Sequence, residues 1–407
     1  MVRFPPALRN PFVISACLCA VMIYGTGAVK RQRETMHSVL AFPRITGLEG
    51  QVISSPVKSR SVYRFLFRPS LVFSSDGVTA GCRGSVSVTL PESQIEAFFP
   101  GRLYSDSRAE LFSIDTGACL RLRGSFSGDV FRAASYEAAG GGYRSAAARI
   151  RAACRLQFRR LLYAWKKPGG LLLALITGSR DFTDPELSDG FKRCGITHLL
   201  ALSGMHLSLL TCAAGVFTGI AGYKIRRLVQ LCTVLLFVWF AGLSPSLLRS
   251  LLCFVILFLC PLPFITVLSV SFLLHLLLYP VHCAEPAFML SYGALAGITL
   301  MADPVKRLLV RMIPGRLAGD LAASVAAQPL TAPVSVRMFR CYAPGGILAS
   351  VCTAPLLLCF MYAGTVCIVC SLLIPRCADI SYLILLFLYR CIESTVSFFS
   401  HIPVFSS

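Results

Sequence analysis

The chain contains 407 residues, of which 55% are hydrophobic and only 14% are charged. A soluble globular protein carries about 25% charged residues, so this composition argues against a water-soluble enzyme. Apolar runs of membrane-spanning length recur along the chain, and they predict a multi-pass membrane protein.

The charged residues are unbalanced, with 39 lysines and arginines against 19 acidic residues and a formal net charge of +20. Most of the excess is arginine, whose planar guanidinium can hold two phosphate oxygens at once. Cytoplasmic loops of membrane proteins are also basic, for topological reasons alone. The overall charge therefore leaves two interpretations open, a phosphate-rich partner and simple membrane topology.

The chain begins with an apolar stretch, residues 11–29, which follows Arg3 and Arg9. Small residues near its end are compatible with cleavage of a signal peptide. Because many apolar stretches follow, we expect residues 1–29 to form a retained transmembrane anchor.

Residues 30–142 contain no apolar stretch long enough to span a membrane. Short runs of β-branched and aromatic residues, separated by turn signals such as Ser75-Asp76-Gly77, predict β-strands. About 90 residues of such strands suit a small β-barrel. Cys82 and Cys119 lie in this polar region and are a candidate disulfide pair if it faces an oxidising compartment. Most of the other cysteines, among 18 in all, lie in apolar runs, where they are expected to act as small hydrophobes.

The segment 143–167 contains eight basic residues and no acidic residue. At helical spacing five of them share one stripe, opposite an apolar face, which predicts a basic amphipathic helix in the membrane interface. Such a helix could bind anionic lipid headgroups or gather a polyanion, and the spacing does not separate the two. The stripe consists of Arg144, Arg151, Arg155, Arg159 and Lys166, and the apolar face of Ala147, Ile150, Cys154, Leu161 and Trp165.

Apolar stretches broken by prolines fill residues 168–407. Interrupted helices at membrane depth are tolerated where they line a cavity or pack inside protein. The predicted fold is therefore an all-α membrane protein, a polytopic bundle of about nine spans with broken or re-entrant helices. It carries the small β-domain near its N-terminus.

Basic loops give a predicted topology. Residues 224–227 and 306–316 are basic and are expected in the cytoplasm, whereas residues 281–285 contain no lysine or arginine and are expected outside. This places the N-terminus in the cytoplasm and the β-domain outside the membrane.

Polar residues interrupt the apolar run Gly195-Ile-Thr-His198-Leu-Leu-Ala-Leu-Ser203-Gly204-Met-His206. This run resembles the signature of the ComEC/Rec2 competence proteins, the inner-membrane channels for single-stranded DNA in natural transformation. Three further elements are similar to family elements and follow in the same order. They are Gly242-Leu-Ser-Pro245-Ser-Leu-Leu-Arg249, Glu285-Pro286-Ala-Phe288-Met289-Leu290-Ser291-Tyr292 and the region of Pro355.

The resemblance covers about residues 165–360, and residues 44–132 are similar, more loosely, to the family's external OB-like domain. Three positions depart from the family pattern: Glu285 replaces aspartate, Met289 replaces glutamine, and Ser350 stands where the family often has asparagine. We also expect a short form without the metallo-β-lactamase-like domain, because no His-x-His-x-Asp-His cluster follows the last apolar stretch. A metal nuclease therefore has no basis in this sequence.

The resemblance implies a channel in the bacterial inner membrane that is not an enzyme and needs no cofactor or metal. It also implies several partners: single-stranded DNA, an external DNA receptor, a cytoplasmic motor or strand-binding protein, and a separate nuclease if there is one. No nucleotide-binding loop supplies energy. The candidates to line the DNA path are His198, Ser203, Gly204, His206, Arg249, Glu285 and Ser291.

Three alternatives remain. Ser203 and His206 are three residues apart and could be an intramembrane serine hydrolase pair, although such spacing rarely aligns a base with a nucleophile. A transporter of another polyanion or solute would also suit broken helices and a midplane site. The third alternative is a family relative that no longer conducts DNA.

Overall fold

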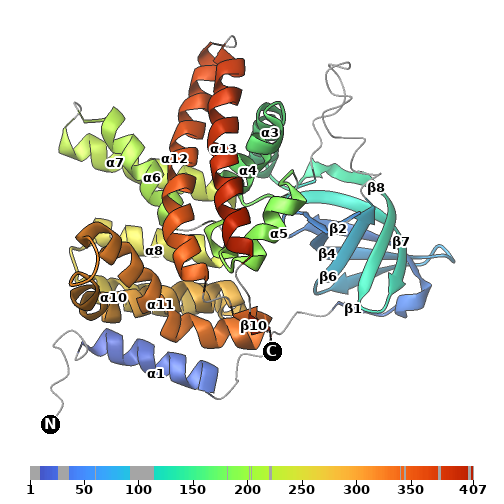
Figure 1. The fold of residues 1–407 in the computed structure, drawn as a ribbon. Coiled ribbons are helices and arrows are strands. Elements are labelled where there is room, and N and C mark those ends of the chain that lie inside the picture. Colours follow the sequence, from blue (N-terminus) through green and yellow to red (C-terminus); the bar gives the residue numbers. More distant parts are fainter. Residues whose placement is uncertain are drawn as a thin grey trace. The chain divides into compact units, whose positions relative to one another are not determined.

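The chain divides into two compact units, each with its own core (Figure 1). The β-unit comprises Gln32–Leu173 and Ser179–Phe182, and the helical unit comprises Met1–Arg31, Ala174–Gly178 and Thr183–Ser407. The computed structural model describes residues 10–25, 36–59, 61–91, 114–180, 182–200, 202, 204–219, 222–339, 341–342, 345–374, 377–401 and 405–406.

The strands of the β-unit form one sheet of eight strands. Polar and apolar residues alternate along them, as in β4, where Tyr63, Phe65 and Phe67 are buried and Arg64 and Arg68 are exposed. This period of two turns one face of the sheet toward a core. The strands are β1 (His37–Ser38), β2 (Ile45–Val52), β3 (Val57–Ser59), β4 (Val62–Ser74), β5 (Thr79–Arg83), β6 (Val86–Pro91), β7 (Ala118–Ser127) and β8 (Val130–Tyr143).

Five of these strands pair in a closed circuit. Strand β4 pairs with β2 and β6, β7 pairs with β2 and β8, and all four of these pairings are antiparallel. The circuit closes through β6 and β8, which are parallel. Its interior is filled by apolar side chains such as Leu48, Phe67, Val88, Leu122 and Phe131, all fully buried.

The candidate disulfide between Cys82 and Cys119 is contradicted by the sheet. Both are free thiols, on β5 and β7, and β4 and β2 lie between these strands. Three strand spacings amount to roughly 14 Å along the sheet, whereas bridged cysteines have Cα atoms within about 7 Å. Cys82 packs against the apolar core, while Cys119 lies between the inward Ala118 and Leu120. The two side chains therefore point to opposite faces.

The predicted basic helix at residues 143–167 is divided in the structure. Helix α3 (Ala146–Tyr163) ends before Trp165, and helix α4 (Lys166–Thr177) begins at Lys166, whose backbone has a φ of 50°. A non-glycine residue rarely adopts this left-handed conformation, and a continuous helix does not pass through it. Lys166 is therefore not part of the same helical stripe as Arg151 and Arg155.

The described residues of the helical unit are mostly helical, which confirms the prediction of a mostly helical protein with an N-terminal sheet region. Pro185, Pro245 and Pro286 each stand at the start of a helix, where the missing N–H costs no hydrogen bond. The elements are α1 (Pro11–Gly25), α5 (Pro185–Arg193), η3 (Thr197–Leu200), α6 (Gly204–Phe217), α7 (Tyr223–Ala241), α8 (Pro245–Leu259), α9 (Phe264–Leu278), η4 (Pro280–Ala284), α10 (Pro286–Leu309), α11 (Gly315–Phe339), β9 (Cys341–Tyr342), α12 (Gly346–Leu373), α13 (Ala378–Ser400) and β10 (Phe405–Ser406).

Three helices of the described chain are long and apolar enough to cross a membrane: α10, α12 and α13. Helices α1, α6, α8 and α9 are apolar but shorter, and a straight span needs about 20 residues. The apolar run that contains His198 and His206 is divided between η3 and α6. The protein is thus a membrane protein, and the number of about nine spans stays a prediction.

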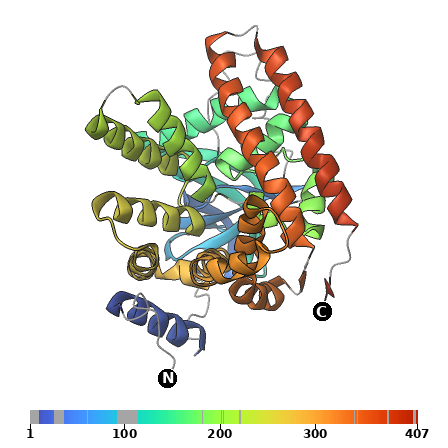
Figure 2. The same ribbon diagram turned by 60° about the vertical axis from the view of Figure 1, so that its left-hand side comes forward.

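Helical hairpins organise the helical unit. Helices α12 and α13 lie side by side as an antiparallel pair, as both views show (Figure 1, Figure 2). Helices α10 and α11 pack so closely that a Cβ at Gly297 would collide with the carbonyl oxygen of Ala326. Helix α1 packs against α9, where Asn10 donates to the Thr266 hydroxyl at 3.3 Å.

The free thiols of the β-unit give a first prediction. Air oxidation of the full chain in detergent micelles, followed by proteolysis and mass spectrometry, should yield no Cys82–Cys119 cross-linked peptide. Burial raises the pKa of the Cys82 thiol to about 11, and the thiolate is the reactive form. Cys82 should therefore alkylate slowly at neutral pH in the folded chain and rapidly in the urea-unfolded control. A high yield of the cross-linked peptide would contradict the strand order.

Candidate functional site

Helix α8 carries an arginine into an apolar part of the helical unit. The helix starts at Pro245, and the preceding Ser244 caps it by accepting a hydrogen bond from the Leu247 N–H at 3.4 Å. Arg249 follows on the second turn and is only 7% exposed. The side chain thus points inward from a fixed position, and does not extend to the surface.

The Arg249 guanidinium is held by neutral oxygen atoms. Nη1 donates to the carbonyl oxygen of Ser291 on α10 at 2.7 Å, and Nη2 donates to the Ser250 hydroxyl at 3.0 Å. Within the described part of the chain, Nε has no partner and no carboxylate lies within ion-pair distance of this side chain. Because an arginine stays charged in proteins, a buried positive charge remains here that only neutral dipoles stabilise.

The N-terminus of α6 adjoins the same guanidinium. A Cβ built on Gly204, the first residue of α6, would lie 3.2 Å from the Ser250 hydroxyl and 3.7 Å from Arg249 Nη2. Glycine therefore allows the helix end to approach α8. A helix N-terminus carries a partial positive charge, so this end adds to the potential of Arg249. The arrangement favours an anion.

The structure brings three of the predicted lining residues together: Gly204, Arg249 and Ser291, the last through its carbonyl oxygen. His206, on the first turn of α6, is buried. His198 lies exposed in η3, and Glu285 precedes α10 without capping it through its side chain. Ser203 lies outside the described residues. The role of each residue in lining a path stays a prediction.

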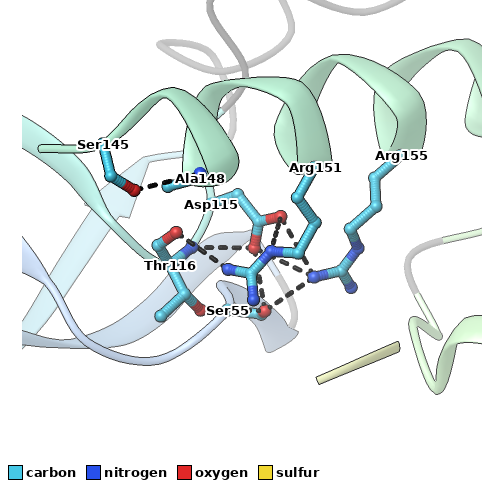
Figure 3. A network of polar contacts seen from close by, with 7 residues as sticks. All are labelled: Ser55, Asp115, Thr116, Ser145, Ala148, Arg151 and Arg155. Carbon is cyan, nitrogen blue, oxygen red and sulfur yellow. Dashed lines mark hydrogen bonds and ion pairs between the residues drawn. The ribbon is translucent and has the colours of Figure 1, made fainter. Parts of the chain in front are cut away.

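The β-unit contains a second arginine site, centred on Asp115 (Figure 3). Arg155 Nη1 donates to both carboxylate oxygens of Asp115, at 3.0 and 3.1 Å, and to the Ser55 hydroxyl at 3.0 Å. Arg151 Nη2 donates to the carbonyl oxygen of Thr116 at 2.8 Å. Arg155 and Asp115 are both buried. This network holds α3 against the segment between β2 and β3 and the residues just before β7.

The prediction that the basic stripe faces lipid headgroups or a polyanion is wrong for its central residues. Its central members Arg155 and Arg159 are buried, whereas Ile150 and Cys154 of the predicted apolar face are exposed. Burial lowers the pKa of Arg155, and Asp115 raises it; the guanidinium remains charged and satisfies the carboxylate. Arg144 stays exposed and donates to Gln51 at 3.4 Å. The stripe is therefore largely a docking face.

Sequence reasoning missed the partners of both arginines. Asp115 and Ser55 are separated from α3 in the chain, and no periodic pattern connects them with Arg155. Ser250 directly follows Arg249, but only the packing of α6 on α8 gives it a role. Among the residues that the structure describes, no group of three or more histidine, cysteine or acidic side chains is placed to hold a metal ion.

Comparison with known proteins identifies the helical unit. A family model described as "Competence protein" matches residues 175–407, which contain Gly204, Arg249 and Ser291. The chain belongs to the competence protein family. This confirms the resemblance to ComEC/Rec2 proteins that the motifs carry.

The competence family match is supported by a similar curated protein, "ComE operon protein 3" from Bacillus subtilis (strain 168). The two are 29% identical over 143 residues, which are 33% of this chain and 18% of the relative. The match thus spans less than a fifth of that relative's length. No solved structure matches the chain.

The Asp115 network gives a second prediction. Replacing Asp115 with Asn leaves buried guanidinium groups without their counter-charge, and removing one partner of a buried ion pair costs about 3–5 kcal/mol. Hydrogen–deuterium exchange of the full chain in micelles should show β7 and the start of α3 opening more often. The matched control Arg149→Ala removes an exposed arginine of the same helix and should stay within about 0.5 kcal/mol of the wild type. Equal protection in both variants would show that the network does not hold α3.

Proposed function

We propose that this chain is a membrane channel for DNA uptake, which passes single-stranded DNA into the cytoplasm during natural transformation. Membership of the competence family supports a role in DNA uptake. The observation that carries the finer proposal is Arg249, a buried guanidinium without a carboxylate partner among the described residues. A phosphate of a translocating strand is an anion of the kind that this charge attracts.

The site residues take different parts in this proposal. Arg249 offers Nε and the charge of its guanidinium to a phosphate, and the N-terminus of α6 adds its partial charge. Ser250 and Ser291 hold the guanidinium in place. Breaking helices at Gly204 and Pro245 lets polar groups reach membrane depth, where a buried charge costs roughly 2.5–3.5 kcal/mol. A wet, cationic path would recover that cost when DNA occupies it.

The β-unit is proposed to be an OB-like domain on the outer side. Support comes from its circuit of five strands with one parallel pairing between β6 and β8, because the OB fold is a five-stranded barrel that binds oligonucleotides. The N-terminus would lie in the cytoplasm and about nine spans would follow. The basic segments 224–227, at the start of α7, and 306–316, around the end of α10, support this orientation in the bacterial inner membrane.

The partners follow from the same proposal. An external receptor would deliver the strand, and a cytoplasmic motor or strand-binding protein would draw it inward. Any nuclease would be a separate chain, and this chain would act without catalysis and without a cofactor.

A transporter of another polyanion is the second candidate. Arg249 favours it equally, because a guanidinium recognises phosphate or carboxylate whatever molecule carries it. Competition by single-stranded DNA and by inorganic polyphosphate for import separates the two candidates.

The third prediction concerns Arg249. In a transformable host whose own copy of this gene is deleted, the Arg249→Gln chain should reduce labelled DNA in the cytosol about tenfold or more, because a hydrogen bond to a charged group contributes roughly 1.5–3 kcal/mol. DNA bound at the cell surface should be unchanged. Exposed Arg226 on α7 provides the matched control Arg226→Gln, which should import normally. Normal import by Arg249→Gln, at equal membrane levels of the protein, would exclude this arginine from the path.

A further inference from the structure

Two histidines form a polar pair inside an apolar cluster of the helical unit. His275 on α9 is fully buried, and its Nε2 lies 3.1 Å from Nδ1 of His282 in η4. The other ring nitrogen of His275, Nδ1, lies 3.3 Å from the Tyr292 hydroxyl on α10. Phe272 and Phe288 pack around these rings. The proposed role of Arg249 does not involve these two histidines.

The short contact between the imidazoles restricts their protonation. At 3.1 Å one nitrogen must carry a hydrogen and the other must offer its lone pair. Charging both rings would bring two like charges and two N–H groups face to face. The geometry therefore suits one additional proton, shared by the pair as an imidazole–imidazolium unit. His282 is partly exposed and gives solvent access.

The Tyr292 hydroxyl can follow this change because a hydroxyl both donates and accepts. When the pair is neutral, the hydroxyl donates to the lone pair on Nδ1 of His275. When a proton from solvent reaches Nδ1, the imidazolium N–H donates to the hydroxyl oxygen, and the hydroxyl hydrogen turns away. Ser271 neighbours the hydroxyl as a further hydrogen-bonding group. One proton enters, the hydrogen bond between Tyr292 and His275 reverses its direction, and no other covalent bond changes.

Helix α10 connects this pair to the arginine site. The carbonyl oxygen of Ser291 accepts from Arg249 at 2.7 Å, and the next residue, Tyr292, binds His275 through its hydroxyl. A positive charge on the pair and the positive charge of Arg249 therefore share one turn of α10. An anion next to Arg249 would relieve their repulsion. The titratable and charged groups around the pair are Arg249 and Cys253 of α8, Tyr279, Cys283 and Glu285 around η4, Tyr292 of α10, and Tyr24 of α1.

We propose that His275 and His282 form a site for a single proton, and that proton binding at this site and binding of a phosphate-bearing polyanion at Arg249 strengthen each other. This inference rests on the proposed function, because it takes a DNA strand as the anion. Coupling between two sites is reciprocal: the bound anion favours the proton, and the bound proton favours the anion. The chain would thereby take up a proton with each phosphate that it holds at Arg249.

The first experiment measures this linkage directly. Calorimetric titration of the full chain in micelles with a short oligodeoxythymidine, in buffers of different ionisation enthalpy, reports the protons taken up on binding. We expect net proton uptake on binding in the acidic range, and an affinity at least about fivefold higher at about pH 5 than at about pH 7.5. His275→Gln should abolish both effects. Tyr292→Phe, which keeps the ring, should weaken both, and the matched control His401→Gln removes an exposed histidine and should change neither.

The second experiment tests the proton site without DNA. Histidine-selective ¹⁵N NMR of the same chain should show His275 and His282 responding together over one titration step. Independent titration of the two rings would overturn the proposal, and so would proton uptake on oligonucleotide binding that persists in His275→Gln. Stoichiometric zinc binding that His275→Gln removes would overturn it in favour of a metal site. Joint titration without any oligonucleotide binding would reject the proposed function and the coupling, while the proton site would stand.

Discussion

The burial of positive charge in apolar surroundings is the constraint on which the rest of this structure depends. A guanidinium cannot lose its proton inside a protein, so each buried arginine requires oxygen atoms placed around it. Arg155 obtains a carboxylate, and Arg249 obtains a carbonyl and a hydroxyl oxygen. The packing of α3 on its sheet, and of α6, α8 and α10 on one another, supplies these oxygens.

The two sites differ in their balance of charge, and this difference separates structure from function. At Asp115 the carboxylate neutralises the nearest guanidinium, so the network is closed and holds a helix in place. At Arg249 the contacting groups among the described residues are neutral, so the guanidinium has no counter-charge there. Arginine therefore holds a helix in place in the β-unit, and it is a candidate binding group in the helical unit.

Helix α10 joins the features of the helical unit. Pro286 starts it, the Ser291 carbonyl holds Arg249, the Tyr292 hydroxyl contacts His275, and Gly297 allows α11 to pack closely. These residues lie within three turns of one of the three helices able to cross a membrane. A displacement of α10 would therefore act on Arg249 and on the histidine pair together. Helix α10 thus gives the helical unit a physical means of coupling the charge of the arginine to the protonation of the histidines.

The sequence by itself determined the class of the protein, because composition, apolar runs and strand alternation depend on local chemistry. The motifs around Gly204, Arg249 and Ser291 also identified residues that the fold brings together, since each motif begins or ends a helix. Only the tertiary structure decided the surroundings of those residues. The inward face of the basic stripe depends on Asp115, some 30 residues before α3, and the separation of Cys82 from Cys119 depends on strand order. The histidine pair depends on the turn between α9 and α10. Such contacts join positions whose spacing follows no helical or strand period, and so only the folded chain determines them.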